Sequence, residues 1–373
     1  MKKKSNINIL FLLHLPLPVH GSSMVGKSIK ESQLINNTFN CRFVNLMLSR
    51  KIEDTGKRSF YKIFRFVIVW LKILIELFKK KPSICYFALT TTGSAFYKDL
   101  ILIAHLKLFG IKRVYHLHNK GVSKHHSNKI KSILYKFVFD GSDVILLSEL
   151  LYPDVQKYVL KSHAFFCPNG IEDNFSEIVL TTQKVPNINK ILFLSNLIES
   201  KGIYVLIDAC SILVNRGIDI NCDIIGGEGD ISISRLNEVI KMKGLSSRIK
   251  YLGKKYNEEK NHAFTEASIF VLPTFYSNEC FPLVLLEAMQ FSLPIVSTFE
   301  GGIPDIVENG ITGFLVPQHD PITLADKIEM LIINPLIRLQ MGKMGRKKYE
   351  KNFTMKIFEH RLVEILQLSM NQN

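Results

Sequence analysis

The stretch from Leu272 to Val296 constrains the fold of this chain more than any other part of the sequence. Residues 281–291 are apolar apart from Gln290 and a single carboxylate, Glu287. A strand would show alternation or a shorter apolar run, so this pattern favours a buried helix. Pro282 suits the first helical position, where its missing N–H has no cost. We therefore expect a buried helix that follows a loop and carries one acid.

The start of this helix lacks a side chain that could cap it. Phe281 has no side-chain oxygen, so the backbone amides of Leu283 and Val284 are left without an obvious acceptor. Free amides at the positive end of a helix form a ready site for a phosphate group. The sequence therefore predicts an anion site at the start of this helix.

Two acids, Glu279 and Glu287, accompany the predicted anion site. An ionised carboxylate cannot be buried without a partner, and the adjacent hydroxyls of a ribose would satisfy Glu287 well. Glu279, in the loop before the helix, would then lie beside a sugar. The alternative is that Glu279 is a surface acid and that Glu287 pairs with a lysine.

The two halves of the chain open in the same way. A buried strand at 7–13 is followed by a loop with Gly21, and a second strand at 190–195 leads through the loop 196–202 into a helix at 203–214. Ligands of open α/β sheets gather at the carboxyl ends of strands, where both loops would lie. Lys201 stands where a helix begins, and a cation is unfavourable at this positive end of a helix unless an anion is bound there. Its position therefore favours a bound anion. An exposed lysine with no such role remains the alternative.

The spacing of Glu279 and Glu287, followed by Ala288 and Met289, resembles the Glu-x7-Glu signature of the family 4 retaining glycosyltransferases. The Lys201 loop, His118 at a strand end, and an Asn-Gly turn at 169–170 occur in the order that this family shows. The resemblance covers nearly the whole chain and is strongest over 191–316. It implies the GT-B fold, in which two Rossmann-like β/α/β domains face each other across a cleft. It also implies transfer of a hexose from a nucleotide-sugar, such as a UDP- or GDP-sugar, with retention of anomeric configuration.

The resemblance further implies roles for individual residues. His118 and Glu279 would position the donor sugar, Lys201 would hold the diphosphate, and Glu287 would hold the ribose. In the family an arginine accompanies the lysine, and Asn196 occupies that position here. The residues expected to bind the donor are Gly21, Asn196, Lys201, Phe281, Leu283, Val284 and Glu287, and those expected to act in catalysis are His118, Glu279 and Lys201.

No metal or other cofactor is expected. The sequence has no Asp-x-Asp motif and no cluster of His and Asp with ligand spacing. Charge on the departing diphosphate would be met by Lys201 and by the amides of Leu283 and Val284. The leaving phosphate would take the acceptor proton on the same face of the sugar, as is thought for retaining enzymes of this fold.

We expect four segments along the chain. An N-terminal acceptor-side domain would cover 1–178, a linker rich in Asn, Thr and Pro would cover 179–189, and a nucleotide-sugar domain would cover 190–352. The last helix, 353–373, would return to the N-terminal domain. His14, Pro16 and Pro18 interrupt the first apolar run, so we interpret it as a strand and not as a secretory signal.

The net positive charge of the protein lies in the first half of the chain. Residues 1–175 carry a net charge of +16, whereas 176–373 carry −1. Residues 57–81 would form a helix with basic side chains along one face and apolar ones over the rest, too interrupted to span a bilayer. It is either a core helix with a solvated cationic stripe or a helix lying on an anionic membrane. Nucleic acid ranks lower as a partner because no RNA-binding signature or zinc-finger spacing is present.

The acceptor is expected to be an acidic or lipid-linked glycan, as in the assembly of bacterial surface polysaccharides. Six scattered cysteines without a Cys-x-x-C pair indicate a reducing compartment, which places the chain in the cytoplasm or on the inner face of its membrane. Two other interpretations remain open. One is a nucleotide-sugar epimerase on the same fold, and the other is a basic binding protein without catalytic activity.

Overall fold

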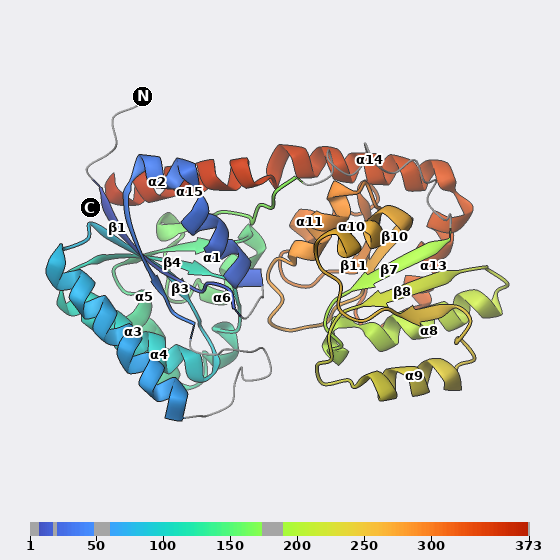
Figure 1. Ribbon diagram of the computed structural model, residues 1–373, viewed down its shortest axis with the longest axis horizontal. Helices are drawn as coiled ribbons and strands as arrows, with labels where there is room; N and C mark the ends of the chain where they lie inside the picture. Colours follow the sequence, from blue (N-terminus) through green and yellow to red (C-terminus); the bar gives the residue numbers. More distant parts are fainter. Residues whose placement is uncertain (1–6, 18–20, 48–59, 174–188, 372–373) are drawn as a thin grey trace. The chain divides into compact units, whose positions relative to one another are not determined.

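The computed structural model describes residues 7–17, 21–47, 60–173 and 189–371. They form two compact units, each built around its own sheet (Figure 1). The N-terminal unit comprises residues 1–170 together with 355–373, and the C-terminal unit comprises 171–354. Most of the predicted linker, 179–188, lies outside the described residues.

The N-terminal unit is a parallel six-stranded sheet with strand order β2-β1-β3-β4-β5-β6. Its strands are β1 (Asn8–Leu13), β2 (Asn40–Asn45), β3 (Ile84–Leu89), β4 (Lys112–Leu117), β5 (Ser142–Leu146) and β6 (Ala164–Phe166). Its helices are α1 (Gly21–Glu31), α2 (Gln33–Thr38), α3 (Phe60–Lys79), α4 (Gly93–Leu108), α5 (Lys129–Phe139), α6 (Tyr152–Val155) and α15 (Met355–Asn371). Helices α3, α4 and α5 cover one face of this sheet, and α1, α2 and α15 lie on the other.

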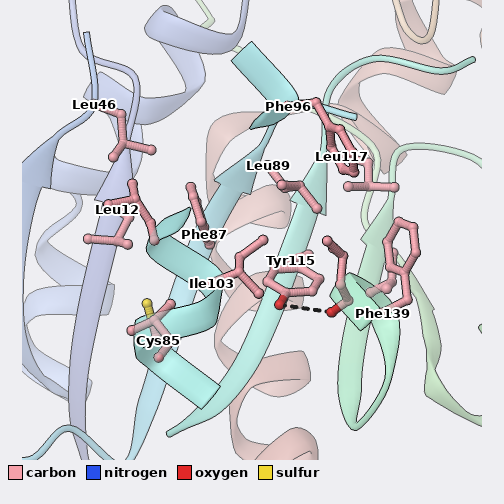
Figure 2. Packing of buried hydrophobic residues seen from close by; sticks show 14 of the residues in the cluster. Leu12, Leu46, Cys85, Phe87, Leu89, Phe96, Ile103, Tyr115, Leu117 and Phe139 are labelled. Carbon is pink, nitrogen blue, oxygen red and sulfur yellow. Dashed lines mark hydrogen bonds between the residues drawn. The ribbon is translucent and has the colours of Figure 1, made fainter. Parts of the chain in front are cut away.

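Alternate residues of the central strands fill the core beneath α3, α4 and α5 (Figure 2). Phe87 and Tyr115 are buried there against Ile103 and Phe139, and the Tyr115 hydroxyl donates a hydrogen bond of 3.1 Å to the Val138 carbonyl. A fully buried side chain of this size contributes about 1.5–3 kcal/mol. Helices cover both faces of the sheet, so its strands carry apolar side chains on both faces. The continuous apolar runs of the sequence predict strands buried in this way.

The C-terminal unit repeats this architecture, with strand order β12-β11-β10-β7-β8-β9. Its strands are β7 (Lys190–Leu194), β8 (Asn221–Ile225), β9 (Ile249–Tyr251), β10 (Ile269–Leu272), β11 (Ile295–Thr298) and β12 (Gly313–Val316). Its helices are α8 (Ile203–Asn215), α9 (Ile233–Met242), α10 (Asn257–Glu266), α11 (Leu283–Gln290), α12 (Ile303–Ile306), α13 (Pro321–Ile333) and α14 (Pro335–Asn352). Every neighbouring pair of strands in both sheets is parallel, which confirms the predicted two-part α/β fold.

One detail differs from the sequence-based expectation. Gly21 is the first residue of α1 and not part of a preceding loop. The strand β12 lies at the sheet edge but is buried, because α13 and α14 pack against it. Helix α15 belongs to the N-terminal unit, where the Ser369 hydroxyl donates a 2.5 Å hydrogen bond to Asp143. The chain therefore leaves the C-terminal unit after α14 and ends on the N-terminal one.

Candidate functional site

Two loops meet at the carboxyl edge of the C-terminal sheet, one after β7 and one after β10. The Phe275 amide donates to the Ser200 carbonyl at 2.8 Å, and the Thr274 hydroxyl donates to the same oxygen at 3.2 Å. Gly202 has φ +86°, and a Cβ there would lie 2.1 Å from the Pro273 carbonyl oxygen. Only glycine allows this approach. Gly202 thus brings the neighbouring Lys201 against the loop after β10.

Lys201 and Glu279, predicted to flank the donor separately, form an ion pair with each other. Their side chains are only 16% and 10% exposed. The Lys201 ammonium also lies 4.7 Å from the ring centroid of Tyr276. An ammonium group has three donors, so pairing with Glu279 leaves donors for a ligand. The pair fixes a positive group beside the start of α11 without burying an uncompensated charge.

A second glycine holds Glu279 from the other side. Gly301 has φ +57°, and a Cβ there would lie 2.2 Å from the Glu279 carbonyl oxygen. The Gly302 amide donates to the Cys280 carbonyl at 2.7 Å. The loop that carries Glu279 is therefore clamped between two glycine-bearing loops. The sequence contained these glycines, but nothing in their spacing indicated which backbone they approach.

Helix α11 begins at Leu283, and Pro282 is its N-cap residue, one position earlier than expected. No side chain caps the helix, and within the described part of the chain nothing accepts a hydrogen bond from the Leu283 or Val284 amide. Leu283, Val284 and Glu287 are partly exposed, whereas the other five residues of α11 are buried. The three predicted ligand contacts thus form the accessible face of this helix.

The side chain of Phe281 is buried and meets the Phe353 ring edge-on, with centroids 5.7 Å apart. It packs in the core, so only the backbone of Phe281 can reach a ligand.

Glu287 is neither buried nor alone. Lys260 of α10 donates to its Oε1 at 2.8 Å, and the two side chains are about a quarter exposed, at 26% and 23%. The structure therefore shows the alternative arrangement, in which Glu287 pairs with a lysine. Because both groups are accessible, Glu287 can exchange this contact for hydroxyl groups at little cost, since pairs this exposed contribute about 1 kcal/mol or less.

Asn196 stabilises the glycine loop 226–229 next to the Lys201 loop. Its side-chain oxygen accepts a hydrogen bond from the Gly227 amide at 3.2 Å, and the Leu197 amide donates to the Gly227 carbonyl at 2.7 Å. A Cβ at Gly226 would lie 1.8 Å from the Ser195 carbonyl oxygen. At the position where the resembled family has an arginine, this chain therefore has an asparagine whose side chain accepts a hydrogen bond from the backbone of the glycine loop.

In the N-terminal unit, His118 follows the last residue of β4, as predicted. Its ring lies 4.2 Å, centroid to centroid, from the ring of His116, which is fully buried. The Tyr86 hydroxyl lies 2.5 Å from His116 Nδ1. Burial holds the pKa of His116 well below its usual value, and His118 lowers it further, so His116 is neutral. Tyr86 and His116 thus form a rigid, uncharged support beneath His118.

Gly21 is not required by the backbone, because a Cβ there would meet nothing within 4 Å. Gly26, one and a half turns later in α1, is required, since its Cβ would lie 2.0 Å from the His14 carbonyl oxygen. This contact presses α1 against the carboxyl end of β1. The sequence analysis selected the first glycine and missed the second, although both lie in the same helix.

Within the described ranges, no three His, Cys, Asp or Glu residues gather in a way that could hold a metal ion. The same residues contain no helix with enough length and apolar character to cross a membrane.

The family of the chain follows from a comparison with known sequences. Residues 177–348, which include Lys201, Glu279 and Glu287, match the family model of glycosyl transferases group 1. The chain belongs to this family. Over 277 residues it is 30% identical to the amylovoran biosynthesis glycosyltransferase AmsK of Erwinia amylovora, covering 71% of this chain and 66% of AmsK. It is 28% identical over 243 residues to the capsular polysaccharide biosynthesis glycosyltransferase CapM of Staphylococcus aureus, covering 59% and 60%. The chain therefore spans no more than about two thirds of the length of these relatives.

A solved structure with the same architecture is that of Anabaena HepE in complex with UDP. It superposes with a TM-score of 0.75 at 18% identity, over 97% of this chain and 100% of that one. This similarity establishes the fold of the chain as the two-domain GT-B architecture.

Proposed function

We propose that this protein is a retaining glycosyltransferase that transfers a hexose from a UDP- or GDP-sugar to a glycan or lipid-linked oligosaccharide of a bacterial surface polysaccharide. Family membership and the names of AmsK and CapM support the class of reaction and the pathway type. The UDP bound in the HepE structure supports a nucleotide-sugar as donor.

The observation that carries the proposal is the Lys201–Glu279 pair beside the uncapped start of α11. A diphosphate placed there would meet a cation and the free Leu283 and Val284 amides. These donors are already fixed by the glycine-bearing loops, so they need no rearrangement as negative charge develops. Glu287, one turn further along the accessible face of α11, would then accept hydrogen bonds from the ribose hydroxyls.

The reaction is a substitution at the anomeric carbon. The bond between this carbon and the diphosphate oxygen breaks, the acceptor hydroxyl oxygen bonds the same carbon on the same face, and its proton passes to the leaving phosphate. Glu279 is assigned to positioning the sugar, because its carboxylate already faces Lys201. His118 is assigned the same task on the family resemblance alone. We assign the neutralisation of the diphosphate to Lys201 and the helix amides and invoke no metal ion.

The acceptor is assigned to the N-terminal unit, whose net positive charge suits a phosphorylated or acidic glycan. We place the enzyme in the cytoplasm or on the inner face of its membrane, because its six cysteines are free thiols, five of them buried.

The test is a panel of labelled UDP-, GDP- and ADP-sugars incubated with the protein, with and without glycan acceptors. Release of nucleoside diphosphate that depends on the acceptor, with retained configuration in the product, supports the proposal. Epimerisation of the donor in the absence of acceptor would identify an epimerase. If no donor reacts or binds, the alternative of a basic binding protein without catalytic activity would hold. Lys250→Ala, which removes an exposed lysine of β9, is the matched control for variants of Lys201.

A further inference from the structure

The outward face of α3 carries a continuous stripe of exposed apolar side chains. Its members recur every three or four residues, as one face of a helix requires. They are Phe60, Ile63, Phe64, Val67, Leu71, Ile75 and Phe78. Phe60 is 92% exposed and Phe78 is 76% exposed, whereas Val69, Ile73 and Leu77 on the opposite face are buried in the core. Helix α3 therefore buries one apolar face, as the core interpretation of residues 57–81 expects, and exposes a second apolar face that this interpretation does not explain.

Helices α4 and α5 continue this exposed apolar face. The residues concerned are Tyr97, Ile101 and Leu108 of α4 and Ile130, Ile133 and Phe137 of α5. The helices are neighbours on one face of the sheet (Figure 1), with the Trp70 and His105 rings 5.5 Å apart between α3 and α4. The Lys107 ammonium of α4 lies 4.5 Å from the Phe137 ring centroid of α5. We call the thirteen exposed residues the three-helix surface.

Cationic side chains border the three-helix surface. Arg65, Lys72 and Lys79 are exposed on α3, and Lys129 and Lys136 are exposed on α5. The three helices contain only two acids, Glu76 and Asp99. Glu76 pairs with Arg42 at 2.9 Å and with Lys79 at 3.4 Å, and Asp99 is buried and accepts a 3.0 Å bond from the Thr90 amide. The positive border therefore depends on Arg65, Lys72, Lys129 and Lys136. An apolar face with a positive border results.

We propose that the three-helix surface docks the N-terminal unit on an anionic lipid bilayer. The apolar side chains would enter the boundary between headgroups and acyl chains, and the basic border would contact lipid phosphates. Only this occupant satisfies both parts of the surface. A polyanion such as nucleic acid would leave the apolar stripe in water, and a second copy of the chain would bring two positive borders together.

Docking is tested by sedimentation with vesicles, which needs neither donor nor acceptor. The probes are vesicles of phosphatidylcholine alone and of phosphatidylcholine with phosphatidylglycerol, each at low and high salt. The protein should sediment with the anionic vesicles at low salt, with binding that weakens as salt rises. A Phe64→Ser/Leu71→Ser variant should partition at least about tenfold more weakly, because each side chain loses its burial in the bilayer. Arg65→Ala should weaken binding about fivefold.

The matched control is a Leu336→Ser/Leu339→Ser variant, since both leucines are exposed on α14 of the C-terminal unit. It should bind vesicles as the wild type does. Equal losses in both double variants, or no binding to anionic vesicles, would overturn the proposal. It would also be overturned by self-association in the absence of lipid that the Phe64→Ser/Leu71→Ser variant abolishes, because the surface would then belong to a second copy. None of these results depends on transfer activity, so failure here is distinct from failure of the proposed function.

Discussion

Replacing Lys201 by Met separates its structural role from its catalytic one. The variant leaves Glu279 as an unpaired carboxylate whose side chain is only 10% exposed. Breaking a buried pair costs 3–5 kcal/mol, and the residual exposure reduces this to about 2–3 kcal/mol. For a unit of this size, the melting temperature should fall by about 4–12 °C. Turnover should fall by about two orders of magnitude, since one preorganised charge donor is lost.

The Lys201→Met/Glu279→Gln double variant decides between the two roles. Glutamine removes the unpaired charge, so thermal stability should recover to within about 1 kcal/mol of the wild type. Transfer activity should stay at the level of the single variant, because no cation has returned to the diphosphate. Calorimetry and a nucleoside diphosphate release assay measure the two quantities on the same protein. Recovery of activity with stability, or wild-type turnover in Lys201→Met, would show that the pair is merely structural.

Four further results are expected. Glu287→Ala should raise the donor KM several-fold with kcat nearly unchanged; an unchanged KM would remove Glu287 from the ribose. Gly301→Ala should destabilise the protein by at least about 1–3 kcal/mol in chemical denaturation, because its φ of +57° and its contact with the Glu279 carbonyl exclude a side chain. Gly21→Ala should be tolerated within about 0.5 kcal/mol, so equal effects at the two glycines would contradict the packing described. The pKa of His116 is lower in the folded protein than in the unfolded chain. As the pH falls below about 6.5, the unfolded chain therefore binds a proton at His116 that the folded protein does not, and the free energy of unfolding should fall. The slope should reach at most about 1.4 kcal/mol per pH unit, and denaturation across pH should show it reduced in His116→Asn.

Local patterns allowed the strands and the key helix to be predicted. The apolar runs that became β1 and β7 and the uncapped start of α11 are properties of a few consecutive residues. The same holds for His118, which follows a strand that is visible in the sequence.

The partners of the charged residues could not be predicted in this way. Lys201 and Glu279 are 78 residues apart, and Glu287 and Lys260 are 27 residues apart, so each pair forms only when separate loops or helices converge. The sequence analysis interpreted Lys201, Glu279 and Glu287 as charges that a ligand would satisfy, with an unspecified lysine as the alternative partner of Glu287. The folded chain satisfies each with another side chain, and their binding roles depend on how readily those contacts exchange.

The glycines show the same limit in another form. Gly202 and Gly301 matter because of the carbonyl groups they approach, and those carbonyls belong to a loop distant in the chain. The exposure of α3 was likewise ambiguous, because a helix with apolar residues over most of its circumference does not reveal which of its faces meets the sheet.

The central claim, that Lys201 and the start of α11 hold the diphosphate of a nucleotide-sugar, is tested most directly by a crystal structure with a nucleoside diphosphate bound. We predict phosphate density within hydrogen-bonding distance of the Lys201 ammonium and of the Leu283 and Val284 amides, with the ribose against Glu287. A nucleotide bound elsewhere, with the Lys201–Glu279 and Glu287–Lys260 pairs unchanged, would contradict the assignment.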